Sequence, residues 1–251
     1  MIDAADMAAV RTDDFLMFLD HRGVYHCALR YYGDRLGTAW PLEGSPQSQA
    51  RKFRMSMIIH HAPQSRSTRL LWLLEELGAD YRIHYVDILR REGQGRTDPA
   101  NPHPLKQAPA LEVDGQVLIE SVLIFLFLTD RHPEAGLAPG PADPRRAEYL
   151  SWLGLYNNVL ETVLTSGPPA GWNETQKAAY AELDRRWRTA IQGGDYILGE
   201  FSALDILFGS LLQWFRAAMP AGEPYDAYVQ RIGARPALKR AWAKDSPDGH
   251  V

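Results

Sequence analysis

The feature that most constrains the fold is a short β-rich run followed by a loop, an amphipathic helix and a second alternating run. The run MIIHH, residues 57–61, is typical of a strand and APQSRS of a loop. TRLLWLLEELG then carries apolar residues at helical spacing and stops at Gly78, and YRIHYV, residues 81–86, alternates as a strand does. Strands joined through a helix are parallel with a right-handed crossover, so this segment predicts a β-α-β unit.

A second group of elements follows a polar stretch that has helical potential. The segment APALEVDGQVLIES contains two strands around an Asp114-Gly115 turn, which is a strong hairpin signal. A helix is expected next, over Ser121–Arg131, where it covers the sheet. The order β-α-β and then α-β-β-α predicts a thioredoxin-like α/β domain over residues 57–133.

The Pro/Gly-rich segment PEAGLAPGPADP, residues 133–144, marks the boundary to a region of different composition. Helical periodicity dominates beyond it, so an all-α helical bundle is expected over residues 142–246. Its predicted helices span residues 145–164, 174–192, 204–218, 225–232 and 236–243.

Residues 1–56 precede both domains as an N-terminal extension of unknown role. The segment GTAWPLEGSPQSQARK is typical of a linker, and a short helix is predicted around Asp14 to Leu19. We expect this extension to be too small for an independent core.

Composition and charge narrow the class of partner. The 251 residues are 45% hydrophobic and 23% charged, which is typical of a soluble globular protein. A net charge of −4 provides no broad basic field, so nucleic acid and anionic membranes are unexpected partners and a small molecule is favoured. No run approaches the roughly 18 apolar residues of a membrane-spanning helix. The start of the chain lacks the features of a signal peptide, so we expect a cytoplasmic location. The single cysteine, Cys27, forms no CxxC pair.

The loop HAPQSRSTR places hydroxyl groups just before a helix. Ser65 and Ser67 are flanked by Arg66 and Arg69, and the free N–H groups and dipole of a helix N-terminus favour an anion there. If the anion is a thiolate, a serine hydroxyl and the dipole lower the thiol pKa from about 8.5 toward neutrality. The alternative is that either serine only caps the helix.

Two further motifs are suited to binding an extended peptide. In Gln107-Ala108-Pro109, a cis proline leaves the backbone of Ala108 free for strand-like pairing, although a proline here also simply starts a strand. Glu120-Ser121 begins the next helix, where Ser121 and the helix amides suit a carboxylate and Glu120 suits an ammonium group. The alternative is again a helix cap.

Together, in this order, the motifs resemble those of cytosolic glutathione transferases. The stretch from residue 57 to 133 looks like the N-terminal domain of that family, and its SRSTRLLWLLEELG run resembles a bacterial and fungal branch. HPLKQAPALEVDGQVLIES resembles the segment with the cis-proline and the Glu/Asp-Ser motif. YILGEFSALDILFGSLLQW and RIGARPALKRA are similar to the helical domain, so the resemblance runs from residue 57 nearly to the end of the chain.

The resemblance implies how the thiol is activated. Ser65 matches the serine of serine-type members and is expected to stabilise the glutathione thiolate, with Ser67 as the second choice. His61 stands where tyrosine-type members keep their tyrosine, and Arg66 where some bacterial members keep a cysteine, so both of those mechanisms are disfavoured.

The same resemblance implies the remaining glutathione contacts. Gln107 is expected to contact the glycine end, and Ala108 to pair with the cysteinyl backbone. Glu120 and Ser121 are expected to hold the γ-glutamyl end. Lys106 replaces a glycine common in the family before the cis-proline, so the local backbone departs from the family pattern.

Side chains of the predicted helical domain supply candidates for a second substrate site. Trp152 and Tyr156 have spacings that suit a cleft wall, and the alternative is that both belong to the bundle core. The surrounding apolar side chains favour an apolar electrophile. Ser202 and Asp205 form an S-x-x-D capping box, which serves folding.

The expected function is therefore conjugation of glutathione to an apolar electrophile, in detoxification, by a homodimer implied by the resemblance. Two alternatives stay open. The same thiolate also serves isomerisation, dehalogenation or peroxide reduction, and a non-catalytic relative of this fold acts as a scaffold for a protein partner. No metal is expected, because His60 and His61 face opposite sides of a strand and lack a third ligand.

Overall fold

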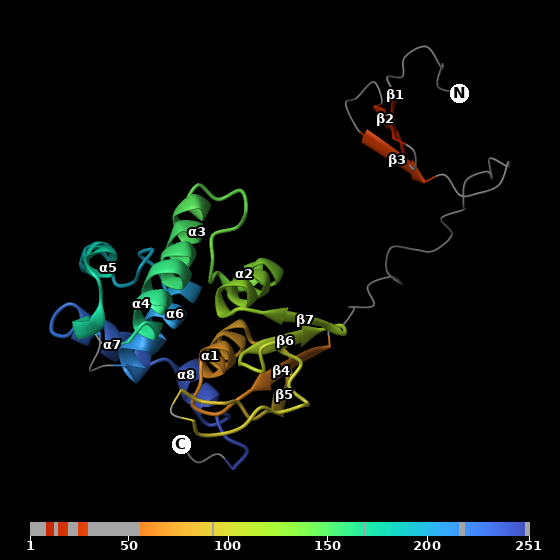
Figure 1. Ribbon diagram of the computed structural model, residues 1–251. Coiled ribbons are helices and arrows are strands. Elements are labelled where there is room, and N and C mark those ends of the chain that lie inside the picture. The colour runs from red at the N-terminus through yellow and green to blue at the C-terminus, as the bar shows by residue number, and fades with distance from the viewer. Residues whose placement is uncertain are drawn as a thin grey trace. The chain divides into compact units, whose positions relative to one another are not determined.

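The computed structural model describes residues 9–12, 15–19, 25–29, 56–91, 93–167, 169–215 and 219–248. Its contacts divide the chain into two compact units, Met1–Phe53 and Arg54–Val251, which are described separately. Figure 1 labels their helices and strands.

The first unit contains an antiparallel sheet of three strands in the order β1-β2-β3. The strands are β1 (Ala9–Thr12), β2 (Phe15–Leu19) and β3 (Tyr25–Leu29). The helix predicted around Asp14 to Leu19 is therefore wrong. The run FLMFL has no polar positions to set a helical period, and β2 hydrogen-bonds to a strand on each side. The predicted linker lies outside the described residues.

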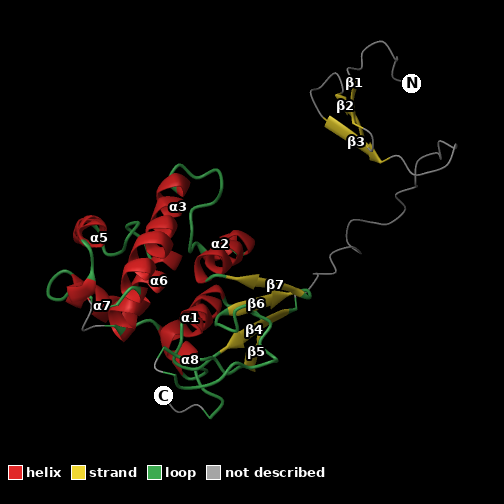
Figure 2. Cartoon of the chain, in the orientation of Figure 1, coloured by secondary structure: helices red, strands yellow, loops and turns green. Residues whose placement is uncertain are grey.

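The second unit is built on a mixed sheet of four strands in the order β5-β4-β6-β7 (Figure 2). β4 (Met57–His61) runs parallel to β5 (Arg82–Tyr85) and antiparallel to β6 (Ala110–Val113), and β6 pairs antiparallel with β7 (Gln116–Ile119). The predicted β-α-β unit and hairpin are both confirmed. At the hairpin turn, Asp114 and Gly115 both have positive φ, at 50° and 82°.

Two helices pack against this sheet and against each other, α1 (Ser67–Leu77) and α2 (Ser121–Arg131). α1 ends at Gly78, which takes the left-handed conformation at φ 60° and donates its N–H to Leu74 O. The helix predicted between β5 and β6 is wrong, because the described residues of that segment contain none. Its prolines lack an N–H donor and clash with a preceding helical turn.

The rest of the unit is helical, as predicted. α3 (Arg146–Leu155) continues through a π-helical turn, η3 (Tyr156–Glu161), into the short α4 (Thr162–Thr165). The other elements are α5 (Glu174–Gly193), α6 (Ala203–Trp214), α7 (Tyr225–Gly233), α8 (Pro236–Trp242) and the 3₁₀ turns η2 (Pro133–Ala135) and η4 (Pro169–Gly171). None of the described helices is long and apolar enough to cross a membrane.

The capping box predicted at the start of α6 is confirmed. Its carboxylate, that of Asp205, also accepts hydrogen bonds from residues outside the cap. Asp205 is fully buried and accepts the backbone N–H groups of Ser202 at 2.8 Å and Ile197 at 3.0 Å. It also accepts the hydroxyl of Tyr228 at 2.8 Å. The cap thus ties α6 to α7.

The last helix packs on the first part of the unit. α8 lies against α1 (Figure 1), where Arg235 pairs with Glu76 and Arg240 with Glu75 at 2.5 and 2.8 Å. Because of this packing, the segment after α8 lies beside the first turn of α1.

Candidate active site

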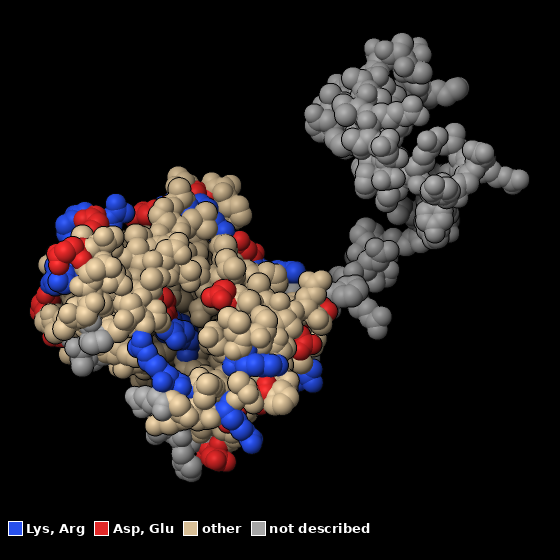
Figure 3. Space-filling model, in the orientation of Figure 1, with Lys and Arg blue, Asp and Glu red and all other residues tan. Residues whose placement is uncertain are grey.

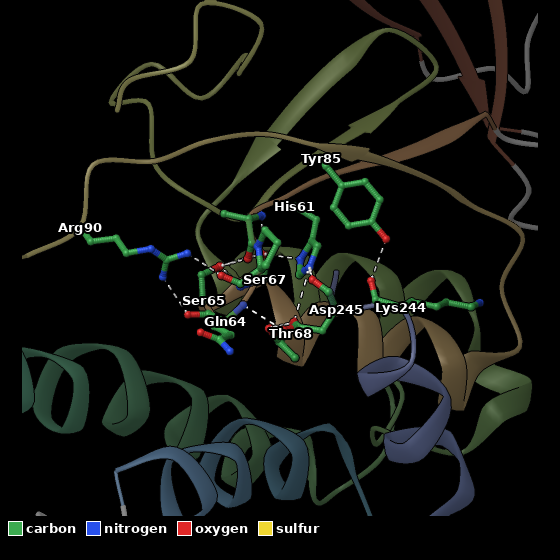
Figure 4. Close-up of polar contacts among 11 residues, drawn as sticks. His61, Gln64, Ser65, Ser67, Thr68, Tyr85, Arg90, Lys244 and Asp245 are labelled. Carbon is green, nitrogen blue, oxygen red and sulfur yellow. Dashed lines mark hydrogen bonds and ion pairs between the residues drawn. The ribbon is translucent and has the colours of Figure 1, made fainter. Parts of the chain in front are cut away.

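Ser65, in the loop between β4 and α1, and Ser67, the first residue of α1, share one hydrogen-bond network (Figure 4). The Ser65 hydroxyl donates to the carbonyl of Ala62 at 2.7 Å and lies 2.8 Å from the Ser67 hydroxyl. The Ser67 N–H donates to the Ser65 hydroxyl at 3.2 Å. Ser65 is half-buried, whereas Ser67 is completely buried, so Ser65 is the more accessible of the two residues.

His61 connects this network to the C-terminal segment. Alternation along β4 points Met57, Ile59 and His61 to the α1 side of the sheet. The Nδ1 of His61 lies 2.7 Å from the Ser67 hydroxyl, and Nε2 lies 2.9 Å from the backbone carbonyl of Asp245. Burial lowers the pKa of His61, although Asp245 acts in the opposite direction.

His60 is buried on the opposite face of the strand. There its Nε2 lies 3.3 Å from Oε2 of Glu112, and its Nδ1 lies 3.1 Å from Nδ1 of His84. Both of the adjacent histidines are buried. Within the described residues, no group of three or more His, Cys, Asp or Glu side chains is placed to hold a metal ion.

Asp245 is a site residue that the sequence reasoning missed. Its carboxylate accepts the Gln64 N–H at 2.9 Å and the Thr68 hydroxyl, so it spans the loop and the first turn of α1. It lies in a short polar segment 184 positions from His61, where no local pattern marks it. Only the packing of α8 on α1 brings it here.

The arginines that flank the serines converge on one carboxylate. Arg69 is completely buried and pairs with Glu161 at 2.9 Å, and Arg66 binds the other oxygen of Glu161 through two nitrogens at 2.7 and 3.0 Å. Burial lowers the pKa of Arg69 to about 10, although the negative charge of Glu161 acts to raise it. Burial opposes ionisation of Glu161, but the two arginines lower its pKa overall. This cluster joins α1 to η3.

Tyr156 belongs to the same cluster. Its hydroxyl donates to Glu161 at 2.6 Å and accepts from Arg69, and only 1% of the residue is exposed. This burial argues against the prediction that Tyr156 contacts a second substrate.

Trp152 faces another part of the helical region. Its ring lies 5.5 Å from that of Phe208 in the core. Its edge borders a groove of about 370 Å³ between α3 and α5, which no residue of the sheet region lines. The structure therefore does not bring Trp152 to the Ser65 loop.

The register of the sheet brings the other predicted motifs to the same edge as Ser65. His60 pairs with Ala110, and Ala110 pairs with Ile119, so the end of β4, the start of β6 and the end of β7 lie side by side. Gln107-Ala108-Pro109 precedes β6, and Glu120-Ser121 follows β7.

The Ala108–Pro109 peptide bond is cis, as the motif suggested. Gln107 is exposed, and its carbonyl accepts the side-chain amide of Asn101 at 2.9 Å. Lys106 has φ 53°, the conformation that glycine adopts most easily, and its ammonium donates to the carbonyl of Asn101 at 2.6 Å. This contact holds the lysine where the family commonly has glycine.

Glu120 and Ser121 lie at the N-terminus of α2. Glu120 is exposed with φ 69°, a strained conformation for a residue with a side chain. The side chain of Glu120 makes no capping hydrogen bond to α2, and its charge acts to raise the pKa of His103, which burial lowers overall.

Basic side chains gather on the face shown in Figure 3, where the sheet region meets the helices. Arg90 donates to the backbone carbonyls of Pro63 and Gln64 at 2.6 and 3.1 Å, and Arg91 donates to the carbonyl of Thr165. Because these partners are uncharged, both guanidinium groups contribute positive potential near the loop.

Comparison with known proteins agrees with the fold and with the arrangement of the motifs. Residues 55–130 match the family described as glutathione S-transferase, N-terminal domain. The chain is 26% identical over 181 residues to glutathione S-transferase GstA of Escherichia coli O157:H7, covering 67% of this chain and 88% of that protein. It is 32% identical over 83 residues to maleylacetoacetate isomerase of Mus musculus, covering 33% and 38% of the two chains.

A solved structure of a sphingomonad glutathione S-transferase, complexed with glutathione, is also similar. It superimposes with a TM-score of 0.59 at 27% identity, covering 75% of this chain and 98% of that one. The domain match at residues 55–130, the Escherichia coli relative and the sphingomonad structure agree, so the chain is similar to glutathione transferases in both sequence and fold.

Proposed function

We propose that the protein binds glutathione, activates its thiol as a thiolate with Ser65, and conjugates it to an apolar electrophile. The observation that carries the proposal is the position of Ser65. It is the half-buried hydroxyl at the N-terminus of α1, at the sheet edge that also presents residues 107–109 and 120–121.

The peptide lies along that edge in this proposal. The backbone of Ala108 pairs with the cysteinyl residue, and Gln107 contacts the glycine end. Ser121 and the first amides of α2 hold the γ-glutamyl carboxylate, while Glu120 holds its ammonium group. The thiol then lies over Ser65, whose proton stabilises the thiolate together with the α1 dipole.

Removal of the Ser65 hydroxyl tests the proposal. Ser65→Ala should keep its affinity for glutathione, because the peptide is held elsewhere, and should lose about tenfold or more in turnover as the bound thiol pKa rises by about one unit. Calorimetry gives the affinity, and conjugation of chlorodinitrobenzene gives turnover. An unchanged rate would refute the role of Ser65.

A second candidate is glutathione-dependent isomerisation, which is favoured by the similarity to the mouse isomerase. The charged groups of Arg90 and Arg91 suit an anionic substrate better than an apolar one. Turnover of maleylacetoacetate that exceeds conjugation of neutral electrophiles would favour this reaction. A scaffold without catalysis would show no specific glutathione binding.

We also propose that the protein acts as a cytoplasmic homodimer in detoxification. Val117 on β7, Leu123 on α2 and Leu150 on α3 are exposed large apolar residues. Arg146 and Asp130 join α2 to α3 at 2.8 Å, so these residues lie on neighbouring elements. Sedimentation should give a dimer that Leu123→Asp weakens, and a monomer at high concentration would contradict this assembly.

A further inference from the structure

We propose that His61 takes up the proton that the glutathione thiol loses, through Ser65 and Ser67. The inference rests on the proposed function, because it assigns a destination to the proton of that same thiol. His61 does not touch the substrate and acts only through the two hydroxyl groups.

The three side chains form a continuous path inward from the sheet edge (Figure 4). The hydroxyl oxygens of Ser65 and Ser67 are 2.8 Å apart, and the Ser67 oxygen is 2.7 Å from His61 Nδ1. Both distances suit proton transfer along hydrogen bonds. Exposure falls along the path, since Ser65 is half-buried and the other two residues are completely buried.

The hydrogen-bond partners determine the resting tautomer of His61. Its Nε2 lies 2.9 Å from the backbone carbonyl of Asp245, and a carbonyl only accepts, so Nε2 carries a proton. In a neutral imidazole Nδ1 is then an acceptor, and Ser67 is the hydroxyl beside it. The Ser67 oxygen in turn accepts the Ala62 N–H at 3.1 Å. The Ser65 proton has two acceptors within reach, the Ala62 carbonyl and the Ser67 oxygen.

From this arrangement the thiol proton moves by three linked transfers. The thiol S–H bond breaks as its proton passes to Ser65, the Ser65 proton passes to Ser67, and the Ser67 proton passes to His61 Nδ1. Each hydroxyl ends with one proton, as it began. The products are a thiolate and an imidazolium, so no electrons are exchanged with another molecule and no proton leaves the site.

Burial disfavours a positive charge on His61 and lowers its pKa, but Asp245 opposes this effect. Ser67 faces it from α1, the Tyr85 ring lies 5.6 Å away on β5, and the Asp245 carboxylate oxygen is 3.5 Å from Nε2. Among the described residues, Asp245 is the charged group that faces His61. It is held there by the Gln64 N–H and the Thr68 hydroxyl, so the carboxylate is already in place when the imidazolium forms.

The relay has a consequence that distinguishes it from proton loss to solvent. If His61 keeps the proton, glutathione binding near neutral pH forms thiolate without releasing a matching proton. Ultraviolet absorbance reports the thiolate, and a pH indicator in weak buffer reports proton release. S-methylglutathione, which has no ionisable thiol, measures the release that comes from the rest of the peptide. After that correction, the full-length protein should release well under one proton per thiolate.

A variant at His61 separates proton uptake from hydrogen bonding. His61→Asn keeps an acceptor for Ser67 but takes up no proton, so we expect about tenfold less bound thiolate near neutral pH and about one proton released for each thiolate that forms. His60→Asn is the matched control, because His60 is also buried on β4 but faces the other side of the sheet. It should retain the thiolate and the low proton release of the unmodified protein.

The outcomes test the two proposals separately. One proton released per thiolate in the unmodified protein, or an unchanged thiol pKa in a folded His61→Asn, overturns the relay and leaves the proposed function intact. Failure to bind glutathione, or binding with an unshifted thiol, overturns both. The proton-release measurement needs no variant, so the relay remains testable if His61→Asn does not fold.

Discussion

The buried charge of Arg69 makes Glu161 the carboxylate whose loss should destabilise the fold most clearly. Arg69 is completely buried, and Glu161 is the acidic group paired with it, at 2.9 Å. Glu161→Gln keeps the shape and an acceptor but removes the charge. Removing one partner of a buried ion pair leaves an uncompensated charge and destabilises by about 3–5 kcal/mol. That is a large share of the roughly 5–15 kcal/mol that stabilises a typical protein.

Urea unfolding followed by tryptophan fluorescence measures this change, and the chain offers a matched control. Glu182 also binds two arginines, Arg185 and Arg186, but its side chain is 50% exposed, against 14% for Glu161. Glu182→Gln should therefore leave the free energy of unfolding nearly unchanged. Equal effects at both glutamates would refute the reasoning, because burial would then have no influence.

A double variant checks the cause. Within the described residues, the Nε and Nη2 atoms of Arg69 have no hydrogen-bond partner. Arg69→Met combined with Glu161→Gln should therefore be more stable than Glu161→Gln alone, since it removes the unpaired charge. A double variant that loses the sum of both single effects would show that the contacts, and not the buried charge, matter.

Two other predictions concern stability. Asp205→Ala removes the acceptor of two backbone N–H groups and of the Tyr228 hydroxyl. It should lower the free energy of unfolding, measured in a thermal melt, by about 3 kcal/mol. A loss below about 1 kcal/mol would contradict this expectation. Burial lowers the pKa of His60 and of His103, so the unfolded chain binds more protons in acid. Stability should be fully present above about pH 6.5 and should fall as pH drops through the folded-state pKa values. Urea midpoints that stay constant from neutral to mildly acidic pH would contradict this expectation.

Short-range patterns predicted most of the local structure of the second unit. Period-two alternation, the Asp114-Gly115 turn and the glycine after α1 each depend on residues close in the chain, so the sequence alone identified them. Where local signals conflicted, the prediction was wrong. The run at 15–19 suits helix and strand equally, and its neighbours in the sheet decide for the strand.

The candidate site likewise combines features that local sequence patterns predict with features that only tertiary packing determines. The sequence by itself determined the order of the motifs: the serines at the start of α1, then the residues before β6 and after β7. The tertiary structure decided that Ser65 is the less buried serine, buried Tyr156 against Arg69, and placed Asp245 beside His61. These contacts join residues far apart in the chain and depend on the packing of α1 against η3 and α8, which no local pattern encodes.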